Sequence, residues 1–169
     1  MINEFEKRLL SSTILIPISM FFIIKGSIFF VFFLSILFLA TSYEWVKMSK
    51  KNDLIKFSGL IYLFVSFYTA FIIRENFDFN VFLFIVTICI FTDIGGYIFG
   101  KTLNGPKLTK ISPKKTYAGV FGGFLLSLTA GLLFTNYLVI DEKIFKNDLI
   151  LFILILFISL ISQIGDLVI

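Results

Sequence analysis

Two aspartates inside apolar stretches are the residues whose chemistry stands out first. Asp93 lies within the apolar stretch 81–100, and Asp166 lies near the end of the apolar stretch 149–169. A carboxylate is costly in the hydrocarbon core of a membrane, so an ionisable residue at that depth usually serves a function. The sequence has no histidine, which excludes imidazole bases and histidine metal ligands. A hard cation such as Mg²⁺, held by carboxylate oxygen atoms, is therefore the metal that these residues predict.

The segment between these aspartates is rich in lysine. Residues 101–117 contain five lysines and two prolines. A Ser-Pro-Lys-Lys-Thr run in this segment offers hydroxyl donors and two adjacent positive charges, from Ser112, Lys114, Lys115 and Thr116. A helix that begins just after the run would add free backbone amides and the positive end of its dipole. The run therefore predicts a site for a phosphate anion. Enrichment of lysine on the cytoplasmic side of a membrane explains the charge alone, but not this order of residues.

Residue spacing shows which side chains share a helix face. Spacings of three and four residues place a carboxylate, a phenol and two glycines on one face: Asp93, Gly96, Tyr97 and Gly100. A second stripe, repeated every four residues, predicts a helix-packing seam: Gly119, Gly123, Ser127 and Gly131. Ser162 and Asp166 also share a face. The structural alternative for Asp93 is a carboxylate paired with a lysine, beside glycines that serve packing only.

Six apolar stretches must position these residues, at 9–24, 27–43, 57–73, 81–100, 118–139 and 149–169. They hold 16 to 22 residues each, and about 20 are needed to cross the hydrocarbon core as a helix. Apolar residues make up 58% of the chain and charged residues only 15%, whereas a soluble domain has about 25% charged residues. We therefore predict an all-α, polytopic membrane helix bundle with about six transmembrane helices, and no nucleic-acid partner.

The distribution of charge predicts the orientation. Of the fifteen lysines and arginines, four fall in loops assigned to the outside, which leaves eleven in the cytoplasm and places both termini there. We divide the chain into an N-terminal helical hairpin with a basic loop (1–56) and a set of membrane helices that carry the site (57–169). The last stretch ends in GDLVI without a polar flank. We therefore expect a fragment that lacks part of its site and is inactive alone.

Three segments together resemble one enzyme family. They are DIGGYIFGK from Asp93 to Lys101, the Ser-Pro-Lys-Lys-Thr run, and SQIGDL from Ser162 to Leu167. This combination resembles the CDP-diacylglycerol synthases, also called phosphatidate cytidylyltransferases, and the pattern of apolar spans agrees over nearly the whole chain. The chain departs from the family at two places. Tyr117 and Ala118 stand where many members have tryptophan and glutamate, and the C-terminal signature with a histidine and two aspartates is absent.

The resemblance implies a multi-pass enzyme of the cytoplasmic (inner) membrane. Such enzymes join CTP and phosphatidate to give CDP-diacylglycerol and diphosphate, with Mg²⁺ as cofactor. The resemblance implies that Asp166 binds the metal, and that Asp93 binds the metal or orients a lysine. It implies catalytic and phosphate-binding roles for Lys114 and Lys115, with Ser112 and Thr116 assisting at the substrate. CTP, phosphatidate and membrane lipids are then the expected partners, and we leave a homodimer open.

Two other functions remain open at this point. A related CTP-dependent enzyme could act on another lipid phosphate or on a polyprenol, because the same site chemistry would serve it. A small transporter of ions or anions is the alternative of a different class, because intramembrane carboxylates and glycine-interrupted helices also suit transport. Magnesium-dependent binding of CTP would favour an enzyme, and flux without nucleotide would favour a transporter.

Overall fold

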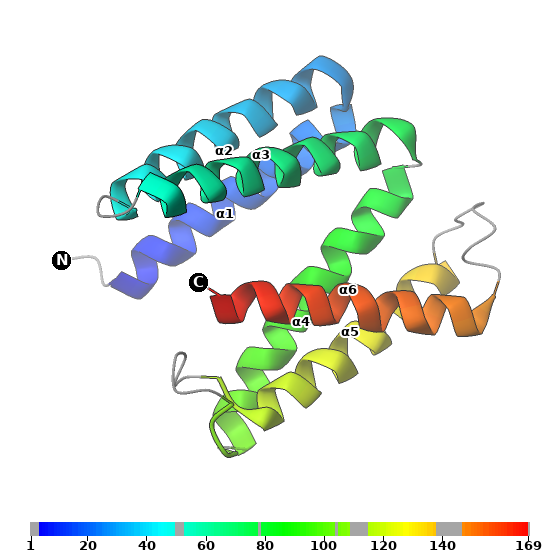
Figure 1. Ribbon diagram of the computed structural model, residues 1–169. Coiled ribbons are helices and arrows are strands. Elements are labelled where there is room, and N and C mark those ends of the chain that lie inside the picture. The colour runs from blue at the N-terminus through cyan, green and yellow to red at the C-terminus, as the bar shows by residue number, and fades with distance from the viewer. Residues whose placement is uncertain are drawn as a thin grey trace. The chain divides into compact units, whose positions relative to one another are not determined.

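The computed structural model describes residues 4–49, 53–77, 79–103, 105–108, 115–137 and 147–168. Within these ranges the backbone forms six α-helices (Figure 1): α1 (Glu4–Lys25), α2 (Ser27–Met48), α3 (Asp53–Asn76), α4 (Phe79–Leu103), α5 (Tyr117–Tyr137) and α6 (Asp148–Val168). Among the described residues, five helices, α2 to α6, are long and apolar enough to cross a membrane, and α1 carries a shorter apolar part, Thr13–Lys25. The predicted all-α, polytopic membrane fold is confirmed.

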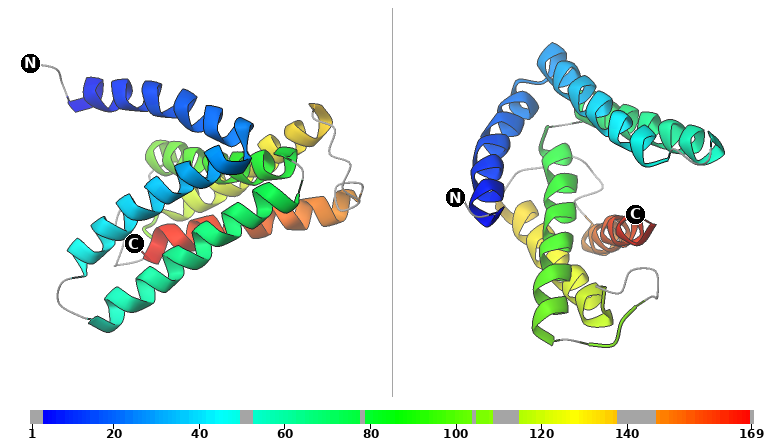
Figure 2. Two further views of the ribbon diagram at one scale, coloured as in Figure 1. Left: turned by 90° about the horizontal axis from the view of Figure 1, so that it is seen from above. Right: turned by 90° about the vertical axis from the view of Figure 1, so that its left-hand side faces the viewer.

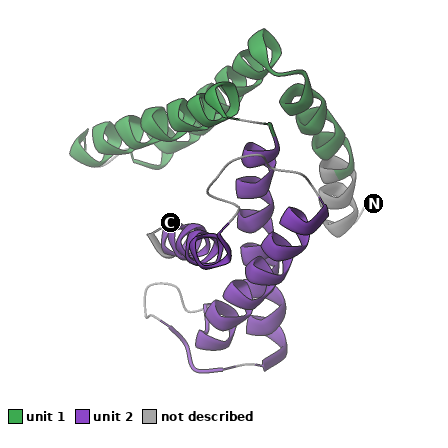
Figure 3. Cartoon of the chain, turned by 90° about the vertical axis from the view of Figure 1, so that its right-hand side faces the viewer, with its two compact units in different colours: residues 1–79 green, residues 80–169 purple. Residues whose placement is uncertain are grey.

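The chain divides into two compact units, Met1–Phe79 and Asn80–Ile169 (Figure 3). The first unit contains α1, α2 and α3. The second contains α5, α6 and all of α4 except its first residue.

In the first unit, α2 and α3 lie side by side (Figures 1 and 2) and pack through aromatic rings. Phe38 contacts Phe67 edge to face, with ring centroids 5.7 Å apart. The turn between α1 and α2 uses left-handed backbone, with φ of 64° at Gly26 and 47° at Ser27. Two residues at the end of α3 hold this turn in place. The Arg74 guanidinium donates to the Ile23 carbonyl (3.0 Å), and the Glu75 carboxylate accepts from the Ser27 amide (3.0 Å).

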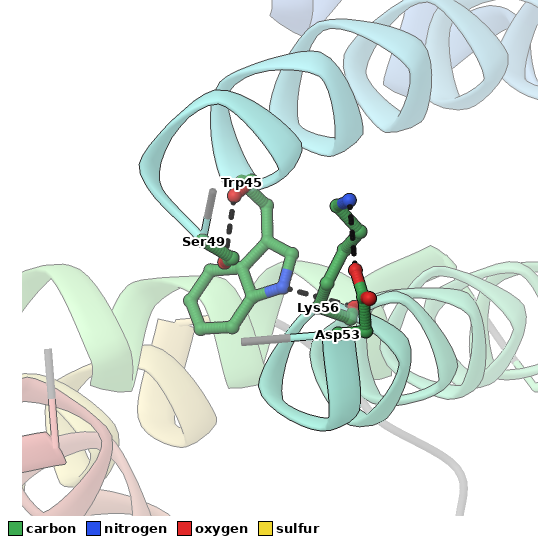
Figure 4. Close-up of polar contacts among 4 residues, drawn as sticks. All are labelled: Trp45, Ser49, Asp53 and Lys56. Atoms are coloured by element: carbon green, nitrogen blue, oxygen red, sulfur yellow. Dashed lines mark hydrogen bonds and ion pairs between the residues drawn. The ribbon is translucent and has the colours of Figure 1, made fainter. Parts of the chain in front are cut away.

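A tryptophan closes the other end of the same unit, where α2 meets α3 (Figure 4). The Trp45 indole N–H donates to the Lys56 carbonyl at 3.2 Å, and its ring covers Gly59 so closely that a Cβ there would overlap it. The Ser49 hydroxyl donates to the Trp45 carbonyl at 2.8 Å. The Trp45 indole therefore ties the end of α2 to the first turn of α3.

The apolar core of the second unit lies between α4 and α6. Phe84 and Ile88 from α4 meet Leu151 and Ile155 from α6, and all four are buried. Leu128 and Phe134 of α5 pack against this cluster. A hydrocarbon environment gives no hydrophobic drive to helix association, so close packing must hold these helices together.

Glycines supply that close packing between α4 and α5. A Cβ on Gly95 would overlap the carbonyl of Gly122, and one on Gly119 would lie 2.8 Å from the carbonyl oxygen of Gly96. Farther along α5, a Cβ on Gly131 would lie 2.6 Å from Ile155 of α6. The predicted seam is thus confirmed, and its four members are buried: Gly119, Gly123, Ser127 and Gly131.

Candidate active site in the second unit

A cleft of about 570 Å³ lies in the second unit, where α4 ends and α5 begins. The four residues predicted to share a face of α4 all line it, which confirms that prediction: Asp93, Gly96, Tyr97 and Gly100. Charged side chains of both signs reach the cleft from α4, from α6 and from the segment that connects α4 to α5. They are Asp93, Lys101, Lys107, Lys115 and Asp166.

The connecting segment is fixed where its two ends meet. Lys107 and Thr116 form an isolated antiparallel β-bridge. The Leu108 amide donates to the Lys115 carbonyl at 2.9 Å, and the Tyr117 amide donates to the Pro106 carbonyl at 3.1 Å. Lys115 therefore enters the cleft from a backbone held by hydrogen bonds on both sides.

Thr116 caps the first turn of α5. Its hydroxyl oxygen accepts a hydrogen bond from the Gly119 amide at 3.1 Å, the bond that an N-cap residue makes to the third helical residue. A hydroxyl that accepts in this way can still donate its own proton to an anion. The other two residues predicted to bind phosphate, Ser112 and Lys114, lie outside the described residues.

An ion pair joins two of the predicted site residues. The Lys115 ammonium contacts the Asp166 carboxylate, and the two side chains are 41% and 44% exposed. The pair connects the start of α5 to the end of α6 across 51 positions of sequence. It therefore places a predicted phosphate-binding lysine directly beside a predicted metal-binding aspartate.

Asp93 lies in the same electrostatic environment. Its carboxylate interacts with the charges of both Asp166 and Lys115, and with the Ser162 hydroxyl. Among the described residues, Lys115 forms its ion pair with Asp166 and not with Asp93.

Two carboxylates from two helices are a sparse donor set for a metal. Within the described part of the chain, no group of three or more histidine, cysteine, aspartate or glutamate side chains could hold an ion. Mg²⁺ is usually bound by one or two carboxylates together with water and substrate phosphates. The oxygen donors of Asp93 and Asp166 fit a Mg²⁺ ion that completes its coordination with a phosphate substrate.

Next to the charged end of the cleft, α4 and α6 share a chain of polar side chains. The hydroxyls of Thr92 and Ser159 are hydrogen-bonded at 2.9 Å, and both residues are buried. The Gln163 amide nitrogen lies 3.4 Å from the Ser159 hydroxyl and 3.4 Å from the Val120 carbonyl of α5. This chain holds α6 against both neighbours, and Gln163 lies three residues before Asp166.

The sequence interpretation gave no role to Thr92 or Ser159. A signal was present in the largely apolar sequence of α6, because Ser162 and Gln163 lie three and four residues after Ser159 and four and three residues before Asp166. Lys101 and Lys107 were counted only as loop charges, although both line the cleft.

Comparison with known proteins extends this description. The model of the cytidylyltransferase family matches residues 53–169, which include every cleft residue named above. The phosphatidate cytidylyltransferase of Rickettsia bellii is 32% identical over 165 residues, covering 95% of this chain and 71% of that protein. That of Brucella melitensis is 34% identical over 113 residues, covering 65% of this chain. The match spans only 40% of the Brucella protein. No solved structure shows a significant match.

Proposed function

The chain belongs to the cytidylyltransferase family, and on this basis we propose that it acts as a phosphatidate cytidylyltransferase. The reaction joins CTP and phosphatidate to give CDP-diacylglycerol and diphosphate, a step of phospholipid biosynthesis. We place it in the cytoplasmic (inner) membrane, with the cleft open to the cytoplasm. The similarity to phosphatidate cytidylyltransferases, which extends over 95% of this chain in the Rickettsia bellii protein, supports the choice of substrates.

The observation that carries the proposal is the Lys115–Asp166 pair beside an open cleft at the end of three membrane helices. Such a position suits one lipid and one water-soluble substrate. The acyl chains of the lipid can stay in the bilayer while its phosphate enters the cleft, and a nucleotide can arrive from the water. A lysine and two carboxylates then supply opposite charges for phosphate groups and for a cation.

The reaction requires that the two substrates are positioned and that the negative charge of their phosphates is neutralised. An oxygen of the phosphatidate phosphate attacks the α-phosphorus of CTP, a new P–O bond forms, and the bond from that phosphorus to the β-phosphate oxygen breaks. Diphosphate leaves with that electron pair. A phosphomonoester is already largely dianionic at neutral pH, so no protein base is required, in agreement with a sequence that lacks histidine.

The residues of the chain act as follows in this proposal. Lys115 exchanges its contact with Asp166 for phosphate oxygens, and the Thr116 hydroxyl donates a hydrogen bond to the same anion. Asp93 and Asp166 would hold the cation. Mg²⁺, when bound, supplies positive charge that stabilises the transferring phosphoryl group and the leaving diphosphate.

The experiment that tests the proposal is transfer of the cytidylyl group of CTP, labelled in its cytidine, into lipid. Membranes that contain the 169-residue chain, and membranes that contain the complete gene product, receive Mg²⁺ and either phosphatidate or a polyprenyl phosphate. We expect phosphatidate-dependent label in the lipid fraction of membranes with the complete gene product, abolished by a chelator, and no label with the 169-residue chain alone. Label that appears only with the polyprenyl phosphate would assign another lipid substrate. Ion flux through vesicles without nucleotide, together with no transfer, would refute the enzyme.

A further inference from the structure

Two lysines of the cleft have no role in the function proposed above. Lys101 lies in the last turn of α4, and Lys107 lies in the β-bridge that pins the connecting segment. Both line the cleft. Lys115 is paired with Asp166, whereas in the part of the chain that the structure describes, neither Lys101 nor Lys107 forms an ion pair.

Lys101 is also held in a defined position. Its ammonium donates to the Tyr97 hydroxyl at 3.4 Å and lies 5.6 Å from the centroid of the same ring. Tyr97 is one helical turn earlier and is 67% exposed. Because the Tyr97 hydroxyl oxygen accepts a hydrogen bond from the Lys101 ammonium, its own O–H can donate a hydrogen bond to an anion. The two side chains thus present two donors to the cleft from one face of α4.

The depth of these residues indicates which phosphate they meet. α4 is a candidate membrane span, and Lys101 stands where its apolar sequence gives way to the polar connecting segment. Lysine and tyrosine at the end of a span lie at the level of lipid head groups. A lipid phosphate reaches this level while its acyl chains remain beside α4, whereas a nucleotide approaches from the water.

We propose that Lys101 and Lys107 bind the phosphomonoester of the lipid substrate, and that Tyr97 positions Lys101. This subsite lies in the same cleft as the Lys115–Asp166 pair, and it would let the cleft hold two phosphorylated substrates at once. The inference rests on the proposed function, because it assigns one of its two substrates to particular side chains.

Lysines at the C-terminal ends of helices also have a general cause, since a positive charge is favoured there by the helix dipole. Lys47 provides the matched control. It lies in the last turn of α2, another candidate span, and it is exposed. It does not line the cleft. If only the helix dipole explained these lysines, Lys101→Gln and Lys47→Gln would change phosphatidate binding equally.

The test is equilibrium binding of labelled dioctanoyl phosphatidate to the complete gene product in detergent, without CTP, and of labelled CTP in a second series. We expect Lys101→Gln and Lys107→Gln each to weaken phosphatidate binding about tenfold, the value of one charge-assisted hydrogen bond. CTP binding should change less than about threefold. Tyr97→Phe should weaken phosphatidate binding less than Lys101→Gln does. Lys101→Arg should retain part of the affinity that Lys101→Gln loses, and Lys47→Gln should leave the affinity for phosphatidate unchanged.

The outcomes distinguish a failure of this inference from a failure of the proposed phosphatidate cytidylyltransferase function. Wild-type protein that binds no phosphatidate would overturn both. Wild-type binding that Lys101→Gln and Lys107→Gln leave unchanged would overturn only the assignment of these lysines. A larger loss of affinity for CTP than for phosphatidate would assign these lysines to the nucleotide instead. Dioctanoyl phosphatidylcholine, which has no phosphomonoester, should not compete, and competition by it would show binding through acyl chains alone.

Discussion

The two units of the chain use polar side chains in opposite ways. In the first unit, they bond to backbone groups near helix ends. Arg74 and Glu75 hold the turn between α1 and α2, and Trp45 bonds to the backbone of α3 (Figure 4). In the second unit, polar side chains run along the facing sides of α4 and α6 and end in charged groups beside a cleft, where Lys115 meets Asp166.

This difference separates structural from functional charge in an apolar chain. A charged group whose partner is a backbone group at a helix end completes hydrogen bonds that water cannot supply. A carboxylate and a lysine that face an open cleft have partners which a ligand can replace. Membrane depth and charge alone do not distinguish the structural role of Arg74 from the proposed binding role of Lys101, because both lie in the last turn of an apolar helix.

The largest expected effect compares an aspartate from each unit. Asp166→Asn should lower the rate of cytidylyl transfer by about 10²–10³-fold, the size of loss seen when one group that stabilises charge in a transition state is removed. Asp53 at the start of α3 pairs with Lys56 at 3.4 Å, but its side chain is 98% exposed. Asp53→Asn should leave the rate within about twofold, because exposed pairs contribute little. Transfer rates at equal amounts of folded protein measure both, and an unchanged rate for Asp166→Asn would remove the metal assignment.

The next effect compares a glycine from each unit. A Cβ on Gly95 would overlap the backbone of α5, whereas one on Gly59 would overlap the Trp45 ring, which can rotate away. We expect Gly95→Ala to cost about 3 kcal/mol of unfolding free energy and Gly59→Ala about 1 kcal/mol. At Gly165 a Cβ would meet nothing within 4 Å, so Gly165→Ala should not destabilise. Unfolding in mixed micelles measures all three, and equal costs for Gly95 and Gly59 would contradict the difference in packing.

A smaller effect concerns the turn in the first unit. Arg74→Met removes two hydrogen bonds to carbonyls at the end of α1, to Ile23 and Ile24. We expect a local loss of about 1.5 kcal/mol, seen as hydrogen exchange about tenfold faster at the amides of this turn. Glu75→Gln keeps an acceptor for the Ser27 amide and should have less effect. Phosphatidate and CTP binding should stay unchanged, and a loss of either would give Arg74 a role beyond the turn.

Much of this fold could be predicted from sequence because its signals are local. Runs of about 20 apolar residues predict membrane helices, and all six runs are helical where the structure describes them. The family was predicted from DIGGYIFGK, SPKKT and SQIGDL, and the family match confirms it. Helix ends were predicted less well. α3 begins at Asp53, four residues before the predicted start, because a helix continues past its apolar part once its polar residues reach water.

The site could be predicted only in part, because its pairing is not local. Spacing alone placed Asp93 and Tyr97 on one face, and both line the cleft. The partner of Asp166 depends on how α4, α5 and α6 cross and on the β-bridge that fixes Lys115, neither of which has a sequence period. The roles of the site residues and the cytoplasmic position of the termini stay predictions.

The smallest expected effect tests whether the polar chain of the second unit acts as one group. Thr92→Val removes one hydroxyl of the buried pair with Ser159, and Ser159→Ala removes the other. Hydrogen bonds between membrane helices contribute about 0.6 kcal/mol on average in double-mutant cycles, so we expect a coupling free energy of that size between the two changes. Unfolding free energies of the two single variants and the double variant measure it.

Ser159→Ala also removes an acceptor of Gln163, which lies three residues before Asp166. We therefore expect Ser159→Ala to lower the rate of cytidylyl transfer more than Thr92→Val does. Strictly additive free energies, with equal transfer rates for both single variants, would show that these hydroxyls do not position the carboxylate.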